Sequence, residues 1–114
     1  RTAAIAGLVE AWRSAWERGR LSDYAGFYAD GAVQDTRRGR EVIRRQKAGL
    51  WKNKAPKKIV FSDIKITPQG DGFTVSLVQD YEGQDGQSDR GRKTLRLAPA
   101  GNGYAIVDEA WGRM

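Results

Sequence analysis

Residues 73–82 read Phe-Thr-Val-Ser-Leu-Val-Gln-Asp-Tyr-Glu, and apolar and polar side chains largely alternate along them. Successive side chains of a β-strand point to opposite faces of its sheet, so this alternation makes one face mostly apolar. That face carries Phe73, Val75, Leu77, Gln79 and Tyr81. An apolar sheet face needs a second layer to cover it. The stretch therefore predicts a half-buried strand in a layered fold.

Three further strands are predicted around this stretch. Residues 58–67 are rich in β-branched and aromatic residues, and a change of phase at Ser62–Asp63 indicates a β-bulge. Residues 91–98 and 104–111 follow, and glycine-containing turns or loops separate the four strands. Short connections of this kind join antiparallel neighbours, so the C-terminal part predicts a meander.

The N-terminal part predicts three helices. The first is indicated by apolar residues at helical spacing, namely Ile5, Leu8, Val9, Trp12 and Trp16. A short second helix is expected to carry Tyr24, Phe27 and Tyr28, and a short strand is expected at residues 32–34. After a turn, a third helix is predicted from about residue 41 to residue 52.

This order predicts an α+β fold, with three N-terminal helices packed on a curved, mostly antiparallel sheet. The length of 114 residues fits one domain over residues 1–114. If the sheet curls, helices and sheet enclose a cone whose mouth is a pocket. Because the chain opens on Arg1, we expect a fragment of a larger protein.

The chain contains no cysteine and no histidine, which excludes several kinds of site. It can form no disulfide, thiolate nucleophile, standard zinc site or imidazole base. An enzyme built from it would rely on Asp, Glu, Lys, Tyr or Arg. The acidic loop at residues 85–89 lacks the later glutamate of an EF-hand loop, so we interpret it as a solvated hairpin. We expect neither a metal ion nor a cofactor. No apolar run has the length of a membrane span.

The positive charge is concentrated in one segment. Residues 37–58 hold ten basic residues against one acid, so this segment carries +9 while the rest of the chain carries −3. One interpretation is a surface that docks an anionic polymer through Arg37, Arg38, Arg40, Arg44 and Lys47, with Arg40, Arg44 and Lys47 on the outer face of the third helix. The other is a solvated helix face and basic loop with Trp51 in the core. No motif for specific nucleic-acid recognition accompanies the charge.

Several motifs resemble those of the NTF2-like superfamily, over residues 8–111. The opening motif consists of Ala15-Trp16, Tyr24 and Phe27-Tyr28-Ala29-Asp30. The closing motif consists of Gln79-Asp80-Tyr81, residues 89–97 and residues 104–111. The superfamily includes ketosteroid isomerases, SnoaL-type cyclases and many non-catalytic modules. The resemblance implies a cone-shaped fold, often a dimer through the sheet, and does not by itself imply catalysis.

The closing motif is most similar to the NTF2-like domain found C-terminal to some bacterial L,D-transpeptidase-type (YkuD) peptidoglycan enzymes. Tyr104 stands where that pattern usually has Trp. A YkuD catalytic domain needs Cys and His, which this chain lacks. The resemblance implies that the chemistry of such a parent protein lies in another domain, and that the protein is periplasmic or in the cell envelope.

A second set of polar residues is expected on the inner strand faces. Strand parity pairs Gln79 with Tyr81, Lys93 with Leu95, and Glu109 with Trp111. We interpret these faces as a ligand pocket lined by Tyr28, Gln79, Tyr81, Lys93, Glu109 and Trp111. The alternative is a buried Lys–Glu pair, with Gln79 and Tyr81 satisfying one another in the core.

These observations leave three functional hypotheses. The first is a non-catalytic accessory domain of a larger bacterial, cell-wall-modifying protein, which binds a small molecule, a cell-wall fragment or a partner. The second is a small isomerase, cyclase or hydrolase with Asp30 or Asp35 as base and Tyr28 or Tyr81 as hydrogen-bond donor. The third is the anion-binding module described above.

Overall fold

Three helices precede most of a six-stranded sheet in the computed structural model, which describes residues 1–114. The elements in chain order are α1 (Thr2–Glu17), α2 (Leu21–Gly26), β1 (Tyr28–Gln34), β2 (Arg37–Arg38), α3 (Arg40–Leu50), β3 (Pro56–Gln69), β4 (Gly72–Gly83), β5 (Ser88–Ala100) and β6 (Gly103–Arg113). None of the helices is long and apolar enough to cross a membrane.

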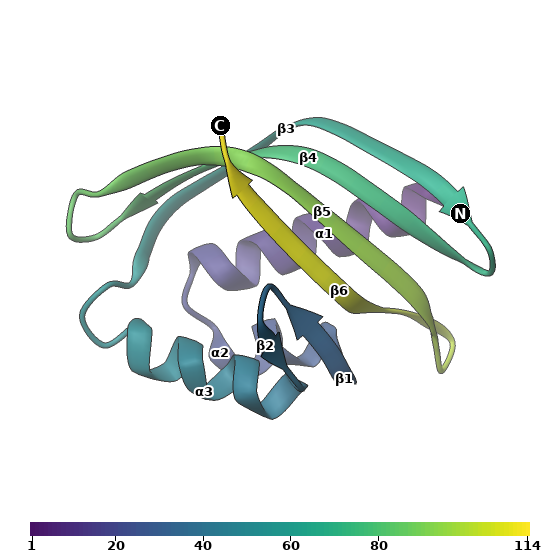
Figure 1. Cartoon of the computed structure of the whole chain (residues 1–114), viewed down its shortest axis with the longest axis horizontal. Helices are drawn as coiled ribbons and strands as arrows, with labels where there is room; N and C mark the ends of the chain where they lie inside the picture. Colours follow the sequence, from purple (N-terminus) through teal and green to yellow (C-terminus); the bar gives the residue numbers. More distant parts are fainter.

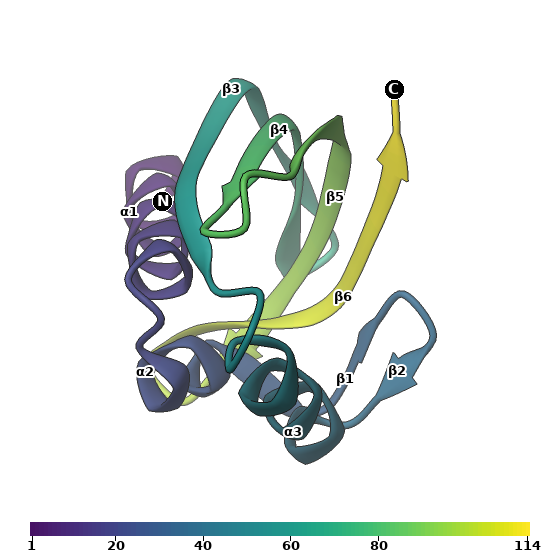
Figure 2. The same cartoon turned by 90° about the vertical axis from the view of Figure 1, so that its left-hand side faces the viewer.

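The strands lie in the order β2-β1-β6-β5-β4-β3. Only β1 and β6 pair in parallel, and the remaining neighbours are antiparallel. The long strands arch over α1, while α2, α3 and the β1–β2 hairpin lie across the open side of the curve (Figure 1). Figure 2 shows α2 and α3 side by side at the base of the molecule. This architecture confirms the predicted α+β class with helices on one side of a curved, mostly antiparallel sheet.

The hydrophobic core lies between α1 and the concave face of the sheet. Trp12 of α1 is fully buried, and so are Leu77 of β4 and Leu95 of β5 beneath it. The helical spacing of Trp12 and Trp16 places both indoles on the same side, with ring centroids 5.6 Å apart. Both tryptophans belong to the hydrophobic core.

The predicted bulge is also confirmed. The pairing of β3 with β4 shifts register between Ser62 and Lys65, and Asp63 has a φ of 52°. Such a residue lies in the left-handed region, which asparagine and aspartate tolerate better than most side chains. The bulge adds a bend to the long edge strand β3.

The prediction that Tyr28 belongs to the second helix is wrong. The helix α2 ends at Gly26, and Tyr28 opens β1, where it pairs with Ile106 of β6. The aromatic spacing of Tyr24, Phe27 and Tyr28 is helical, but pairing with a distant strand decides the conformation of the last residue. The turn predicted before the third helix likewise contains the short strand β2.

Candidate functional site

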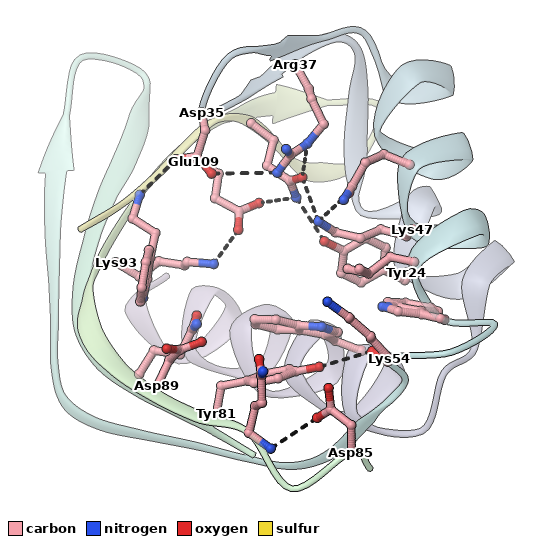
Figure 3. A pocket seen from close by; sticks show the side chains of 18 residues that line it. Tyr24, Asp35, Arg37, Lys47, Lys54, Tyr81, Asp85, Asp89, Lys93 and Glu109 are labelled. Carbon is pink, nitrogen blue, oxygen red and sulfur yellow. Dashed lines mark hydrogen bonds and ion pairs between the residues drawn. The ribbon is translucent and has the colours of Figure 1, made fainter. Parts of the chain in front are cut away.

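A pocket of about 340 Å³ opens between the concave sheet face and the helical base (Figure 3). Its volume falls in the range of small-molecule sites. Aromatic side chains from α1, α2, β4, β6 and the segment after α3 form its apolar walls, namely Trp16, Tyr24, Tyr81, Trp111 and Trp51. Its remaining lining is mostly charged or amide side chains.

A buried ion pair lies on the sheet side of the pocket. The Nζ atom of Lys93 is 2.5 Å from Oε2 of Glu109, and the two side chains are 5% and 3% exposed. Lys93 also stands 4.8 Å from the ring centroid of Trp16, close enough for a cation–π interaction. Burial alone would raise the pKa of Glu109, but the charge of Lys93 and the hydrogen bonds to the carboxylate hold it below its usual value. Glu109 is therefore ionised at neutral pH.

The other carboxylate oxygen of Glu109 accepts two further hydrogen bonds. Tyr28 donates its hydroxyl at 2.5 Å and Gln34 donates Nε2 at 2.9 Å. Burial and the charge of Glu109 raise the pKa of Tyr28 and of Tyr24 well above the ordinary tyrosine value. Both phenols thus stay protonated, and the Tyr24 hydroxyl accepts hydrogen bonds from Tyr28 and from Nε2 of Gln34. The Glu109 carboxylate is fully occupied by groups of the chain itself.

Two cations form the opposite side of this network. Oε1 of Gln34 accepts a hydrogen bond from Nε of Arg37 at 2.9 Å and one from Nζ of Lys47 at 3.0 Å. Lys47 is only 8% exposed. Burial and the nearby Arg37 charge lower the pKa of Lys47 to about 8, although Glu109 acts in the opposite direction. Figure 3 shows Lys47 and Lys93 on opposite walls of the pocket, with Glu109 between them.

The prediction that Lys47 lies on the outer face of the third helix is wrong. Lys47 lies one helical turn after Ile43, which is fully buried, and residues four apart share a helix face. The long side chain follows this face inward until its ammonium group reaches Gln34.

Two polar atoms that belong to lining residues have no partner. The Oε1 atom of Gln79 and the Nε1 atom of Trp111 are buried, and no hydrogen bond satisfies either. Gln79 is 5% exposed, so its amide is largely shielded from water. Most buried polar atoms in proteins are hydrogen-bonded, and each exception requires a physical explanation.

The mouth of the pocket is acidic on the side of the β4–β5 loop. Asp85 and Asp89 line it there, together with Tyr81 and Lys54. The Tyr81 hydroxyl donates to the Lys54 carbonyl at 3.5 Å. Partial burial raises the pKa of Tyr81, and the charges of Asp85 and Asp89 add to the effect. The pocket therefore has a cation-rich inner end and an acidic outer edge.

Five of the six predicted pocket residues line this cavity, namely Gln79, Tyr81, Lys93, Glu109 and Trp111. Tyr28 does not line the pocket, and it lies behind three residues that do, because its hydroxyl bonds to Glu109, Tyr24 and Gln34. The strand-parity argument is confirmed, because these residues share the concave sheet face. The alternative is confirmed in one part and wrong in the other. The buried pair of Lys93 and Glu109 is present, but Gln79 and Tyr81 do not satisfy one another, since Tyr81 bonds to Lys54 and Gln79 Oε1 has no partner.

The two candidate bases lie in different surroundings. Asp30 is 89% exposed and pairs with Arg40 at 2.5 Å, and it does not line the pocket. Asp35 does line the pocket, where its Oδ1 accepts a hydrogen bond from the backbone N–H of Trp111 at 3.1 Å. Asp35 has a φ of 54° in the turn between β1 and β2, which directs the chain from one strand to the other. Of the two, only Asp35 has access to a bound ligand.

The basic segment divides between two locations. Arg37 and Lys47 line the pocket, whereas Arg38 and Arg44 remain outside it. Arg44 is held by Glu41 at 2.6 Å, and Arg40 by Asp30. The predicted anion-binding set is therefore divided between the pocket and the outside of the molecule, and anion binding by these residues stays a prediction.

The sequence reasoning missed Gln34 as a site residue. Gln34 has the same strand parity as Ala32, and both side chains are buried. A polar residue on the same strand face as an apolar one could therefore have indicated a site residue. Trp16 and Tyr24, which the sequence pattern places in the first and second helices, also line the pocket and were not among its predicted residues. Nothing in the local pattern indicated that Asp85 and Asp89 would lie at its mouth.

Comparison with known proteins identifies relatives of the whole chain. The sequence profile of the family described as "Cds6 C-terminal NTF2-like domain" matches residues 4–110. There is no significant match among the curated proteins.

Solved structures give the same fold. Bd1075 from Bdellovibrio bacteriovorus superposes with a TM-score of 0.86 at 27% identity, over 96% of this chain and 40% of that one. The chain thus spans well under half of the length of Bd1075. An NTF2-like protein from Cytophaga hutchinsonii has a TM-score of 0.86 at 12% identity, covering 100% and 98% of the two chains. An NTF2-like protein of unknown function from Pseudomonas putida has a TM-score of 0.83 at 19% identity, covering 98% and 87%.

Proposed function

The chain belongs to the family of Cds6 C-terminal NTF2-like domains, and on that basis we propose that it is a non-catalytic accessory domain that binds a small polar ligand in its pocket. The observation that carries this proposal is the pair of unsatisfied atoms in the lining, Gln79 Oε1 and Trp111 Nε1. Leaving such groups unpaired costs about 1–3 kcal/mol each, and a ligand that pairs with them recovers this cost.

Binding is favoured over catalysis by how the charged groups are used. Glu109 accepts hydrogen bonds from Lys93, Tyr28 and Gln34, so it is not free to abstract a proton. Asp35 accepts a hydrogen bond from the Trp111 backbone and lies 3.7 Å from Arg37, so its carboxylate already has partners within the chain. Groups that are mutually satisfied in this way suit a rigid binding wall.

The parent protein is proposed to be a larger bacterial enzyme of the L,D-transpeptidase type. This rests on the similarity of the closing motif, residues 79–111, to domains found beside YkuD-type catalytic domains. It also agrees with the chain spanning only 40% of the length of Bd1075. In such a protein the pocket would hold a fragment of the cell-wall polymer near a separate catalytic domain.

Titration with disaccharide-peptide fragments released from peptidoglycan tests this function, with binding followed by tryptophan fluorescence and NMR. The wild-type chain is expected to bind, and Gln79→Leu to weaken affinity about tenfold through the loss of one buried hydrogen bond. Gln69→Leu is the matched control, because Gln69 is exposed at the end of β3.

Absence of binding to the folded wild-type chain would overturn the proposal, and so would equal affinities of wild type and Gln79→Leu. Conversion of the fragments, abolished by Asp35→Asn, would instead support the hypothesis of a small enzyme.

A further inference from the structure

We infer that the pocket recognises a peptide end that carries a free α-carboxylate, with the carboxylate at the cation-rich inner end and the adjoining amide between Gln79 and Trp111. This inference rests on the proposed binding function and specifies the ligand class. It follows from the unused hydrogen-bond capacity and from the distribution of charge.

The inner end has more donors than acceptors. A lysine ammonium group has three N–H donors. Lys93 uses one of them on Glu109. Lys47 uses two, one on Gln34 and one on Gln46. Arg37 uses Nε on Gln34, and its terminal nitrogens make no hydrogen bond, with Asp35 at 3.7 Å. The acceptors at this end are already occupied, because Glu109 and the Gln34 carbonyl each receive at least two donors. A ligand that enters here meets free N–H groups, which favour an anion.

The charge balance supports the same conclusion. Three cations, Arg37, Lys47 and Lys93, face two carboxylates at the inner end. One of these carboxylates, Asp35, is 41% exposed and therefore partly screened by solvent. The lowered pKa of Lys47 shows that burial and the Arg37 charge are not fully compensated. A bound carboxylate would supply that compensation, and a planar carboxylate matches the paired donors of an arginine.

The unsatisfied pair marks the position of an amide. Gln79 offers an acceptor and Trp111 a donor, which is the complement of one peptide group with its N–H and C=O. The two residues lie on the same sheet face, on the two strands that flank β5. Gln79 of β4 pairs with Gly91 of β5. Trp111 of β6 pairs with Lys93, two residues further along β5. Because Gly91 has no side chain, the indole of Trp111 lies over its backbone, which brings Nε1 toward the Gln79 side of β5.

The spacing along the sheet fits an amide next to a carboxylate. Gln79 and Lys93 are diagonal neighbours across β4 and β5, because Leu77 is the residue directly opposite Lys93. Diagonal neighbours on one face have Cα atoms about 7–8 Å apart. A long lysine side chain therefore reaches the carboxylate of the residue whose amide bonds to Gln79. The acidic mouth at Asp85 and Asp89 then accepts N–H groups from the preceding part of the peptide.

Calorimetric titration with matched dipeptides tests this inference. The probes are N-acetyl-alanyl-alanine in its D,D and L,L forms, each compared with its C-terminal carboxamide. At least one free acid is expected to bind at least tenfold more tightly than its carboxamide. Lys47→Met and Arg37→Gln are expected to remove this preference, while Gln79→Leu weakens the acid and the amide alike.

Arg38→Gln is the matched control, because Arg38 is exposed on the same short strand as Arg37 and lies outside the pocket. Thermal unfolding confirms that each variant is folded, and two cation variants guard against the misfolding of one. Equal affinity for acid and carboxamide overturns the inference. Binding of peptidoglycan fragments without any binding of the dipeptide acids also overturns it, while the proposed function stands. Absence of binding by every probe overturns both.

Discussion

Glu109 is the residue on which the buried polar network depends. Its carboxylate receives Lys93 from β5 and both Tyr28 and Gln34 from β1, so it joins two strands that are not neighbours in the sheet. A buried charge is costly unless it is paired and hydrogen-bonded, and here both conditions are met. The network therefore holds β1 to the long strands through polar contacts as well as through the β1–β6 pairing.

Replacing this carboxylate should destabilise the fold strongly. In Glu109→Gln the ammonium group of Lys93 remains buried without a counter-charge, and we expect the free energy of unfolding to fall by about 3–5 kcal/mol. The double variant Lys93→Met, Glu109→Gln should recover part of this loss, because the uncompensated charge is gone. Urea denaturation at pH 7 measures both changes.

The pKa of Glu109 is lowered in the folded chain, so the stability that its ionised form contributes is lost only below the ordinary pKa of 4.5. This contribution is therefore complete at pH 7.

Asp108→Asn is the matched control for this experiment. Asp108 precedes Glu109 on β6, points to the opposite face and is exposed, so its change should stay within about 0.5 kcal/mol. A loss in Glu109→Gln as small as that of the control would show that the ion pair does not stabilise the fold.

Lys47 predicts a dependence of stability on pH. Its pKa is about 8 in the folded chain against an ordinary value of 10.5, so between these values the unfolded chain binds a proton that the folded chain has released. The free energy of unfolding should therefore rise with pH across this window, by an amount on the order of 3 kcal/mol for the full shift. The charged groups that face Lys47 are Arg37 and Lys93, which lower its pKa, and Glu109 and Asp35, which raise it.

Urea denaturation of wild type and Lys47→Met between about pH 7 and 9.5 measures this effect. The range stops there because Tyr24 and Tyr28 have raised pKa values in the folded chain. At higher pH these tyrosines therefore lower the free energy of unfolding, which would mask the contribution of Lys47. Wild type is expected to gain stability with rising pH, whereas the variant should show a flatter profile. Parallel profiles for the two proteins would contradict the prediction.

At the scale of elements, the contact between β5 and β6 depends on a glycine. A Cβ atom at Gly91 would lie 2.6 Å from Cε2 of Trp111 and closer still to the carbonyl oxygen of Gly112. Glycine at this position thus lets β6 approach with its indole lying over the backbone of β5. One side of the pocket owes its shape to this absence of a side chain.

Gly91→Ala should therefore change the pocket as well as the stability. We expect a loss of about 1–3 kcal/mol from overpacking, together with a shifted tryptophan emission as the Trp111 indole is displaced. Urea denaturation and fluorescence spectra measure these two effects. Gly112→Ala is the control on the paired strand, because a Cβ atom there has no neighbour within 4 Å. Equal effects of the two substitutions would contradict this account of Gly91.

The elements that could be predicted are those whose pattern is local. The alternation over residues 73–82 predicts β4, and the helical spacing of Ile5, Val9 and Trp12 predicts α1, because each element buries one regular face. The inward position of Gln79, Lys93 and Glu109 followed from strand parity in the same way. These residues form the sheet side of the pocket, which is why that side was predictable.

The remaining errors arise where distant segments decide the outcome. Tyr28 leaves its helical spacing because β6 offers it a pairing partner, and the sequence contains no local sign of this parallel pairing. Lys47 turns inward because Gln34, thirteen residues away, accepts its hydrogen bond. The helical base of the pocket therefore required the fold itself, whereas the sheet side did not.

At the scale of the whole molecule, the net charge of +6 is distributed differently from its order in the sequence. The ten basic residues of segment 37–58 are not equally available to a partner, since Arg37 and Lys47 line the pocket and several others are held in ion pairs. Three exposed members make no ion pair and lie outside the pocket, namely Arg38, Lys52 and Lys58. The cations free to meet a polyanion are thus far fewer than the sequence suggests.

The salt dependence of binding to duplex DNA, used here as a polyanion of uniform charge, measures that number. Each phosphate contact contributes about −0.9 to the slope of log K against log salt, so three free cations predict a slope near −2.7 and a loss of roughly 40-fold over a fourfold rise in salt. Replacing Arg38, Lys52 and Lys58 together by glutamine should abolish most of this slope. Arg96→Gln is the control, because Arg96 is an exposed, unpaired cation on β5, outside the segment. A slope near −9 would mean that the whole segment binds as one surface, and would favour the anion-binding hypothesis over the division of the segment described here.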